Sequence, residues 1–147
     1  MAQLLEFFRL FADQCHHGKE ESLLFPFLEQ KGIPRQGGPI GVMLHEHEEG
    51  RLLIREMGEA AEDYRSGIEG AGARWAKAAS GYSSLLRSHI DKENNILFVM
   101  AERVLTPADQ SQLFQDFEKL EVEKMGAGTH ERLHVMMDKL LAEFPAQ

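Results

Sequence analysis

Cysteine is almost absent from this chain of 147 residues, which contains Cys15 alone. A single thiol excludes an intrachain disulfide, and it favours a reducing, cytoplasmic setting. The sequence also lacks an apolar run long enough to span a bilayer, and its first residues lack the basic and apolar pattern of a secretion signal. We therefore expect neither export nor a membrane anchor.

Positive charge is the second scarce feature. The chain carries 16 Lys and Arg residues against 24 Asp and Glu residues, a formal net charge of −8. Such a surface repels phosphate backbones and anionic lipids, so we expect neither nucleic acid nor a membrane as a partner. Hydrophobic residues make up 43% of the chain, which suffices for one core, and the length predicts a single domain over residues 1–147.

Alternating, strand-like patterns and tandem repeats are missing as well, whereas apolar residues recur at intervals of three and four. Pro26 should kink or end the first helix early. Segments rich in glycine and proline separate the helices. The fold class is therefore all-α, an up-down helical bundle in which three long helices are closed by two shorter ones. The predicted helices cover residues 2–30, 40–64, 73–105, 108–125 and 130–144.

The seven histidines fall into four tight groups, each within a predicted helix: His16, His17, His45, His47, His89, His130 and His134. Two of these groups contain a histidine followed four residues later by a glutamate, on the apolar side of the helix. Since residues four apart project from the same face, each imidazole and carboxylate should point together toward the core. Burying them without a partner is costly, and a metal ion would remove that cost.

Two such pairs, His16 with Glu20 and His89 with Glu93, lie on different long helices, and His47 points inward from the third. Imidazole and carboxylate ligands without thiolate suit iron, manganese or zinc. Two carboxylates from separate helices can bridge two ions in the core of a bundle. The pattern thus predicts a metal centre with these five ligands.

Other polar residues lie close in sequence to the apolar, inward-facing stripe of these helices. His17 and His45 are one and two residues away from it, so we expect them to face solvent or to support the ligands. Glu21 and Glu46 are expected to be solvated, or else to act as additional carboxylate ligands. Cys15 is interpreted as a buried, inert thiol.

Three runs resemble the hemerythrin-like family with its His-His-Glu cation-binding domain: CHHGKEESLLFPFLEQKGIP, GGPIGVMLHEHEEGR and LLRSHIDKENNILFVMAERVL. The resemblance covers about residues 11–105 and leaves two C-terminal helices within 106–144. It implies a four-helix bundle around two non-haem, carboxylate-bridged iron ions, and it implies reversible binding of dioxygen or sensing of oxygen, nitric oxide or iron. It would place His16 and Glu20 on the second family helix, His47 on the third, and His89 and Glu93 on the fourth.

The sequence departs from the family pattern in two places. No histidine precedes Cys15, so the usual first helix is missing, and Met43 stands where oxygen carriers have a further histidine. Three explanations stay open. The C-terminal helix folds back and supplies His134, or His130, as the lost ligand; a second copy of the chain donates the helix in a homodimer; or the sequence is truncated.

Three functions follow from these observations. The favoured one is a non-haem di-iron protein that binds or senses dioxygen, nitric oxide or a similar small ligand, with zinc and manganese compatible with the same ligands. The alternative is a di-metal enzyme, a ferroxidase or a peroxide-consuming protein. The third is a degenerate helical interaction module with an incomplete site. We assign no catalytic residue and lean against an enzyme.

Overall fold

The computed structural model describes residues 1–126 and 128–143, and in this part of the chain every regular element is a helix. The all-α prediction is confirmed. The first rod, here called the N-terminal rod, consists of α1 (Ala2–Phe7), η1 (Phe8–His17), η2 (Glu20–Leu24) and α2 (Phe25–Gln30). The helix α3 (Pro39–Arg65) follows, and then a second composite rod, the α4–α5 rod, made of α4 (Ala71–Lys92), η3 (Glu93–Leu97) and α5 (Phe98–Val104). The chain ends with α6 (Pro107–Met125) and α7 (Thr129–Glu143). The predicted end of the last helix at residue 144 lies outside the described residues.

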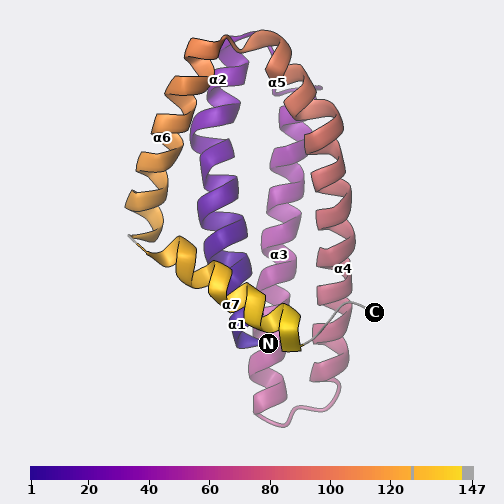
Figure 1. The fold of residues 1–147 in the computed structure, drawn as a ribbon. Helices are drawn as coiled ribbons and strands as arrows, with labels where there is room; N and C mark the ends of the chain where they lie inside the picture. Colours follow the sequence, from indigo (N-terminus) through magenta and orange to yellow (C-terminus); the bar gives the residue numbers. More distant parts are fainter. Residues whose placement is uncertain (127, 144–147) are drawn as a thin grey trace.

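The N-terminal rod, α3 and the α4–α5 rod stand side by side, and α6 runs along the outer side of the N-terminal rod (Figure 1). The most extensive packing joins α3 to α4. Within the described ranges, no helix has the length and apolar character needed to cross a membrane.

The two composite rods contain π-helical segments, which the spacing of apolar residues did not predict. Glu20 is the first residue of η2 and Glu93 is the first residue of η3. A π-helical turn holds one more residue than an α-helical turn, and such turns are frequent at functional sites. Pro26 was expected to kink or end the first helix, but it occupies the first turn of α2 directly after η2, where a missing N–H is tolerated.

Two hydrophobic clusters fill the bundle. One joins η2, α2, the start of α3, η3, α5 and α6, and includes Phe25, Leu28, Met43 and Leu97. The other joins α1, α3 and α4, and includes Met57. On each of the three rods, the buried polar residues come between the positions that form these two clusters. The polar centre is therefore enclosed by apolar packing along the rods.

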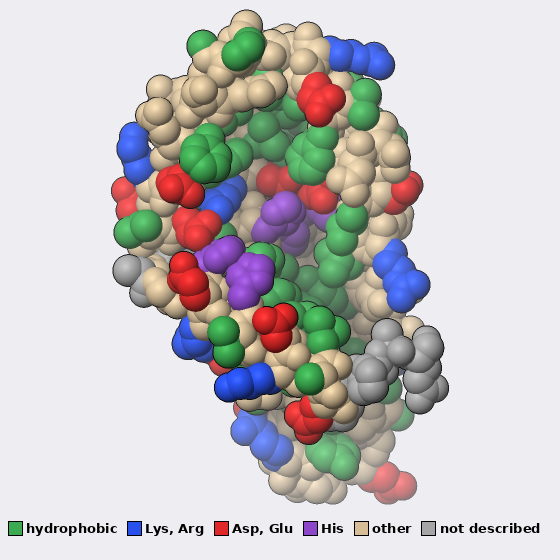
Figure 2. Space-filling model, viewed as in Figure 1, with side chains coloured by type: hydrophobic (Ala, Val, Ile, Leu, Met, Phe, Trp, Pro, Cys, Tyr) green, Lys and Arg blue, Asp and Glu red, His purple; other side chains and the backbone are tan. Residues whose placement is uncertain are grey.

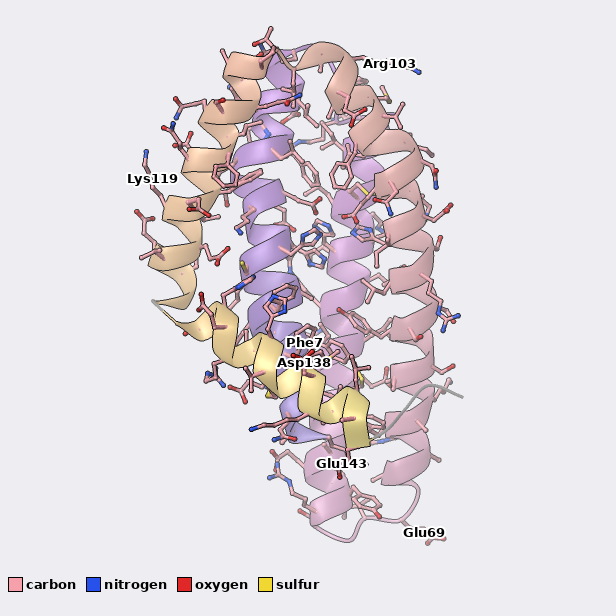
Figure 3. The ribbon with its side chains drawn as sticks, in the orientation of Figure 1. Phe7, Glu69, Arg103, Lys119, Asp138 and Glu143 are labelled. Carbon is pink, nitrogen blue, oxygen red and sulfur yellow. The ribbon has the colours of Figure 1, made fainter. Side chains whose placement is uncertain are left out.

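The last two helices follow different paths. The helix α6 packs its buried Leu113 into the first cluster. The helix α7 crosses the lower part of the bundle at an angle, as its labelled residues Asp138 and Glu143 show in Figure 3. It is held there by Leu133, which is fully buried, and by an ion pair of 2.8 Å between Arg132 Nη1 and Glu6 Oε1. The C-terminal helix therefore does not run parallel to the rods, as a replacement for a bundle helix would.

Candidate metal centre

Four buried side chains from three rods meet in the middle of the bundle: Glu20, His47, His89 and Glu93. Each is no more than 3% exposed. One potential ligand atom from each of the four lies within 4.8 Å of the others. Nitrogen-bearing rings gather at this level between the rods in Figure 3. The two His-x-x-x-Glu pairs and the third inward histidine, which the sequence pattern predicted to converge, do so.

Each carboxylate lies between two imidazoles. Glu20 Oε2 is 3.3 Å from His47 Nε2 and 3.8 Å from His16 Nε2. Glu93 Oε1 is 3.1 Å from His89 Nε2 and 3.3 Å from His16 Nε2. The two carboxylates therefore face His47 and His89 on one side and His16 on the other.

Several buried polar atoms at the centre make no hydrogen bond to any described residue. They include both carboxylate oxygens of Glu20 and the Nε2 atoms of His47 and His89. Unsatisfied buried groups of this kind are rare and costly, because each has lost its contact with water. A cation between these atoms would satisfy all of them. The donor set, imidazole nitrogen with carboxylate oxygen, fits iron, manganese or zinc.

The opposite ring nitrogens of the two inner histidines are held by carboxylates. His47 Nδ1 lies 2.7 Å from Glu21 Oε1, and His89 Nδ1 lies 3.0 Å from Glu46 Oε2. Metal-binding histidines are oriented in this way, because an Nδ1–H donated to a carboxylate leaves the Nε2 lone pair free for the metal. Glu21 and Glu46 were expected to be solvated or to be ligands. Instead they support the ligands.

These supporting carboxylates are themselves paired with cations. Arg51 Nη2 lies 2.7 Å from Glu21 Oε1, and Arg51 Nε lies 2.7 Å from Asp13 Oδ1. Lys92 pairs with Glu46. Both outer carboxylates thus lie between a cation and a histidine.

The two central carboxyl groups differ in their affinity for a proton. Burial raises the pKa of Glu20 to about 8, and the nearby Glu93 adds to this shift. Burial also acts to raise the pKa of Glu93, but the adjacent imidazoles of His16 and His89 outweigh it and hold that pKa well below its usual range. Burial and the neighbouring charge thus favour a proton on the metal-free pair, which titrates as a unit. Metal binding must displace it.

The histidines are perturbed as well. Burial lowers the pKa of His47 although Glu21 opposes the shift, and burial lowers the pKa of His17 to about 4 although Asp13 opposes it. For His89, burial acts in the same direction, but Glu93 and Glu46 raise its pKa overall. The neutral form of His47 is the form that binds a metal.

The two adjacent histidines on the N-terminal rod differ in exposure: His16 is more exposed than expected, and His17 takes the supporting role and not the solvent-facing one. The side chain of His16 is 45% exposed although its Nε2 reaches both carboxylates, whereas His17 is only 4% exposed. The ring of His17 stacks on that of His47, with centroids 3.8 Å apart and 13° between the planes. The reason is the π-helical backbone of η1, which rotates the following residues relative to an α-helical stripe.

The structure does not bring His130 and His134 to this centre. Their Nε2 atoms lie 3.3 Å from each other, and both rings contact Phe11 instead. The oblique path of α7 explains this, because it carries both histidines across the surface. His45 is exposed.

Two other positions agree with their sequence interpretation. Met43 is 1% exposed and packs in the apolar cluster. Cys15 is buried, with its Sγ atom 3.9 Å from Glu121 Oε2 on α6, and burial raises the pKa of its thiol.

The chain is similar in sequence to proteins that are named for iron–sulfur cluster repair. An iron-sulfur cluster repair protein YtfE from Edwardsiella ictaluri is 38% identical over 89 residues, covering 58% of this chain and 40% of that protein. An iron-sulfur cluster repair protein DnrN from Neisseria gonorrhoeae is 39% identical over 87 residues, covering 56% of this chain and 54% of that protein. The chain thus spans between two fifths and just over half of the length of these relatives. No solved structure matches the chain.

The family described as hemerythrin HHE cation binding domain matches residues 1–101, which include all three rods up to α5 and every residue of the buried centre. The chain belongs to the hemerythrin family.

Proposed function

We propose that the buried centre binds two non-haem iron ions. The observation that carries this proposal is the orientation of His47 and His89. Each has its Nδ1 next to a carboxylate and its Nε2 buried, without a hydrogen-bond partner in the described chain, and directed toward Glu20 or Glu93. This is the arrangement of metal-binding imidazoles.

The roles of the ligands follow from the distances. His47 and His89 would hold one ion together with one oxygen from each carboxylate. His16 would hold the second ion, again with Glu20 and Glu93. Iron bound here would supply redox chemistry and open coordination positions for small ligands.

We further propose that the chain serves the repair of iron–sulfur clusters by exchanging iron. The names of the YtfE and DnrN relatives support this, although the chain spans only part of their length. The exposure of His16 supports it too, since an ion held by a solvent-accessible ligand can leave or enter without opening the bundle. Figure 2 shows histidine side chains within a hollow on this face of the molecule. A reducing cytoplasm is the setting we propose.

Binding of dioxygen or nitric oxide is the second candidate. Five side chains serving two ions leave coordination positions free, and Met43 contributes no further ligand because it is packed in the core. The structure favours a ferroxidase or peroxidase less, because Glu21 and Glu46 are engaged by histidines and cations instead of being available as extra ligands.

The metal content of the protein tests the first proposal. Protein produced with ample iron and purified without oxygen is expected to contain two irons per chain, measured together with its molar mass in solution. Less than one metal per chain would contradict the proposal.

Two further measurements separate the candidate functions. Transfer of radiolabelled iron to a cluster-depleted iron–sulfur protein is expected if the chain repairs clusters. A reversible, oxygen-dependent absorption band without iron transfer would instead favour ligand binding. Steady-state consumption of iron(II) or peroxide would favour an enzyme.

A further inference from the structure

His130 and His134, which lie away from the buried centre, form a close pair of their own on α7. Their Nε2 atoms lie 3.3 Å apart, and their ring centroids lie 4.4 Å apart with 58° between the ring planes. Because the two nitrogens are closer together than the two centroids, the rings converge at their Nε2 ends. His134 is exposed and His130 is half-buried, so the pair lies at the surface.

The separation of the two nitrogens suits a single metal ion. Zinc binds imidazole nitrogen at about 2.0–2.1 Å, so two imidazoles on one tetrahedral ion have nitrogens about 3.3–3.4 Å apart. The observed distance of 3.3 Å falls in this range. Histidines four residues apart on one helix face are also the spacing with which helices bind zinc. One ion can therefore be held by both histidines, with water in its remaining positions.

The N-terminal rod holds the pair in place. The ring centroid of Phe11 on η1 lies 5.6 Å from that of His130 and 5.5 Å from that of His134. Leu133, which comes between the two histidines in sequence, is fully buried. The helix that carries the pair is thus already fixed to the bundle, and ligands that are held in place before binding lose less entropy when an ion arrives.

The pair also lies near the exposed histidine of the buried centre. His16 comes five residues after Phe11 on η1, and the hydrogen bonds of a π-helix join residues five apart. His16 therefore lies about one turn farther along the same face of the rod as the ring that the pair contacts. Figure 2 shows histidine side chains both within the hollow and at its lower edge, over α7.

We propose that His130 and His134 form a surface site for one divalent transition-metal ion, and that this site passes metal to His16 and receives it from there. The second part rests on the proposed function, because it needs a buried centre that exchanges iron. Two protein ligands hold an ion weakly, so the surface ion is lost during purification. The pair therefore changes the rate of exchange and not the amount of iron that the buried centre finally holds.

Nickel(II) alone is the probe for the surface site, because imidazole suits nickel and nickel binds a given site more tightly than iron(II) does. The titration uses the metal-free full chain carrying Glu20→Gln and Glu93→Gln, which removes the buried carboxylates. Nickel bound by the buried histidines is common to all variants and cancels in the comparison. Adding His134→Gln should weaken nickel binding at the surface at least about tenfold, since loss of even a supporting residue costs that much. His45→Gln changes an exposed histidine that has no histidine four residues away, and it should have no effect.

A relocated pair separates binding from exchange. His130→Gln combined with Asp138→His keeps two histidines four residues apart, but one turn farther along α7 (Figure 3). Nickel binding should return in this variant, which shows that its loss in His134→Gln is not a folding defect. Iron(II) loading is then followed anaerobically by stopped flow in chains that keep both buried carboxylates. Loading should be several times slower in His134→Gln and in the relocated pair than in the unaltered chain, with the same final iron content.

The outcomes separate this inference from the proposed function. Equal nickel affinity with and without His134→Gln overturns the surface site and makes the pair a packing contact. If nickel binding is lost but iron loads equally fast, or if the relocated pair loads as fast as the unaltered chain, the transfer to His16 is overturned. A chain that takes up no iron contradicts the proposed function on its own measurement, and the nickel titration still decides whether the pair binds metal.

Discussion

Single residues decide how the centre presents its nitrogen atoms. His47 and His89 each have two ring nitrogens in different surroundings, one beside an outer carboxylate and one facing an inner carboxylate. The outer carboxylate fixes both the tautomer and the orientation of the ring. The buried part of the site is therefore prepared for a metal by residues that do not touch it.

Replacing Glu46 with glutamine tests this role. Glu46→Gln removes the negative charge that accepts the His89 Nδ1–H and pairs with Lys92. We expect the affinity for iron or zinc to fall about 10- to 100-fold, the usual cost of losing such a partner, with the helical content unchanged. The measurement is a metal titration against a competing chelator. Glu49→Gln on the exposed side of the same helix is the matched control, and an equal loss in both variants would refute the argument.

Among the helical elements, the π-helical segments explain what the sequence could and could not predict. Spacing of three and four placed Glu20, His47, His89 and Glu93 on inward faces, because each lies on an apolar stripe that ordinary helical geometry describes. The same spacing placed His16 inward and gave His17 a solvent-facing or supporting role, since it assumed 3.6 residues per turn through η1. No residue in that segment signals the wider turn, so the exposure of the two histidines could not be predicted.

Contacts between helices that are distant in sequence were the second feature that the sequence could not predict. The functions of Glu21 and Glu46 depend on which neighbouring rod faces them, and a single-helix pattern does not contain that information. The direction of α7 likewise depends on Leu133 and on the contact of Arg132 with Glu6, which is 126 residues away. The sequence could indicate that α7 exists, but not that it crosses the bundle.

The position of α7 leads to a prediction about its histidines. His134→Ala, alone or with His130→Ala, should leave the iron content of the buried centre unchanged, because both rings contact Phe11 and each other on the surface. His89→Ala, made in parallel, should lose metal. Iron per chain after purification is the measurement, and loss of iron in the α7 variants would restore the idea that this helix supplies a ligand.

The start of α6 depends on a capping box and on an ion pair to the N-terminal rod. Thr106 and Asp109 exchange side-chain to backbone hydrogen bonds, and Asp109 Oδ2 lies 2.7 Å from Lys31 Nζ. The bond with Lys31 and those with Thr106 lower the pKa of Asp109 to about 2. Because the folded pKa is below the unfolded value of 3.8, this stabilisation is complete above about pH 4 and is lost as the pH falls toward 2.

The Asp109→Asn variant should therefore have a lower free energy of unfolding than the unaltered chain at neutral pH. Between pH 4 and pH 2.5, its free energy of unfolding should fall less than that of the unaltered chain. Thr106→Ala should lower the free energy of unfolding by about 1 kcal/mol, the usual cost of removing a cap. Urea unfolding of the metal-free protein at both pH values measures each effect. Glu118→Gln, an exposed change on the same helix, is the control, and a profile for Asp109→Asn that follows the control would contradict the capping argument.

At the scale of the whole molecule, the buried polar centre lowers the stability of the folded chain as long as no ion is bound. Among the described residues, the metal-free chain buries five imidazole and carboxyl side chains, His17, Glu20, His47, His89 and Glu93, and several of their polar atoms lack partners there. These side chains lie between the two apolar clusters, so the same rods that pack well at both ends must also enclose unsatisfied groups in the middle. A bound metal satisfies them only in the folded state, and its binding energy therefore adds to the stability of the fold.

Removing the metal should consequently lower the thermal unfolding midpoint. A ligand that binds only the folded chain stabilises it by about 2.7 kcal/mol at a free concentration 100 times its dissociation constant. We expect iron-loaded protein to unfold at a clearly higher temperature than protein treated with chelator. The chain carrying Glu20→Gln and Glu93→Gln should lose most of this difference, because it lacks both carboxylate ligands. Its metal-free form should be at least as stable as the unaltered metal-free chain, because it no longer buries two neighbouring carboxyl groups. Anaerobic scanning calorimetry, with molar mass measured on the same samples, checks both expectations. Equal midpoints with and without iron in the unaltered chain would show that the buried imidazoles and carboxylates are not held together by a metal.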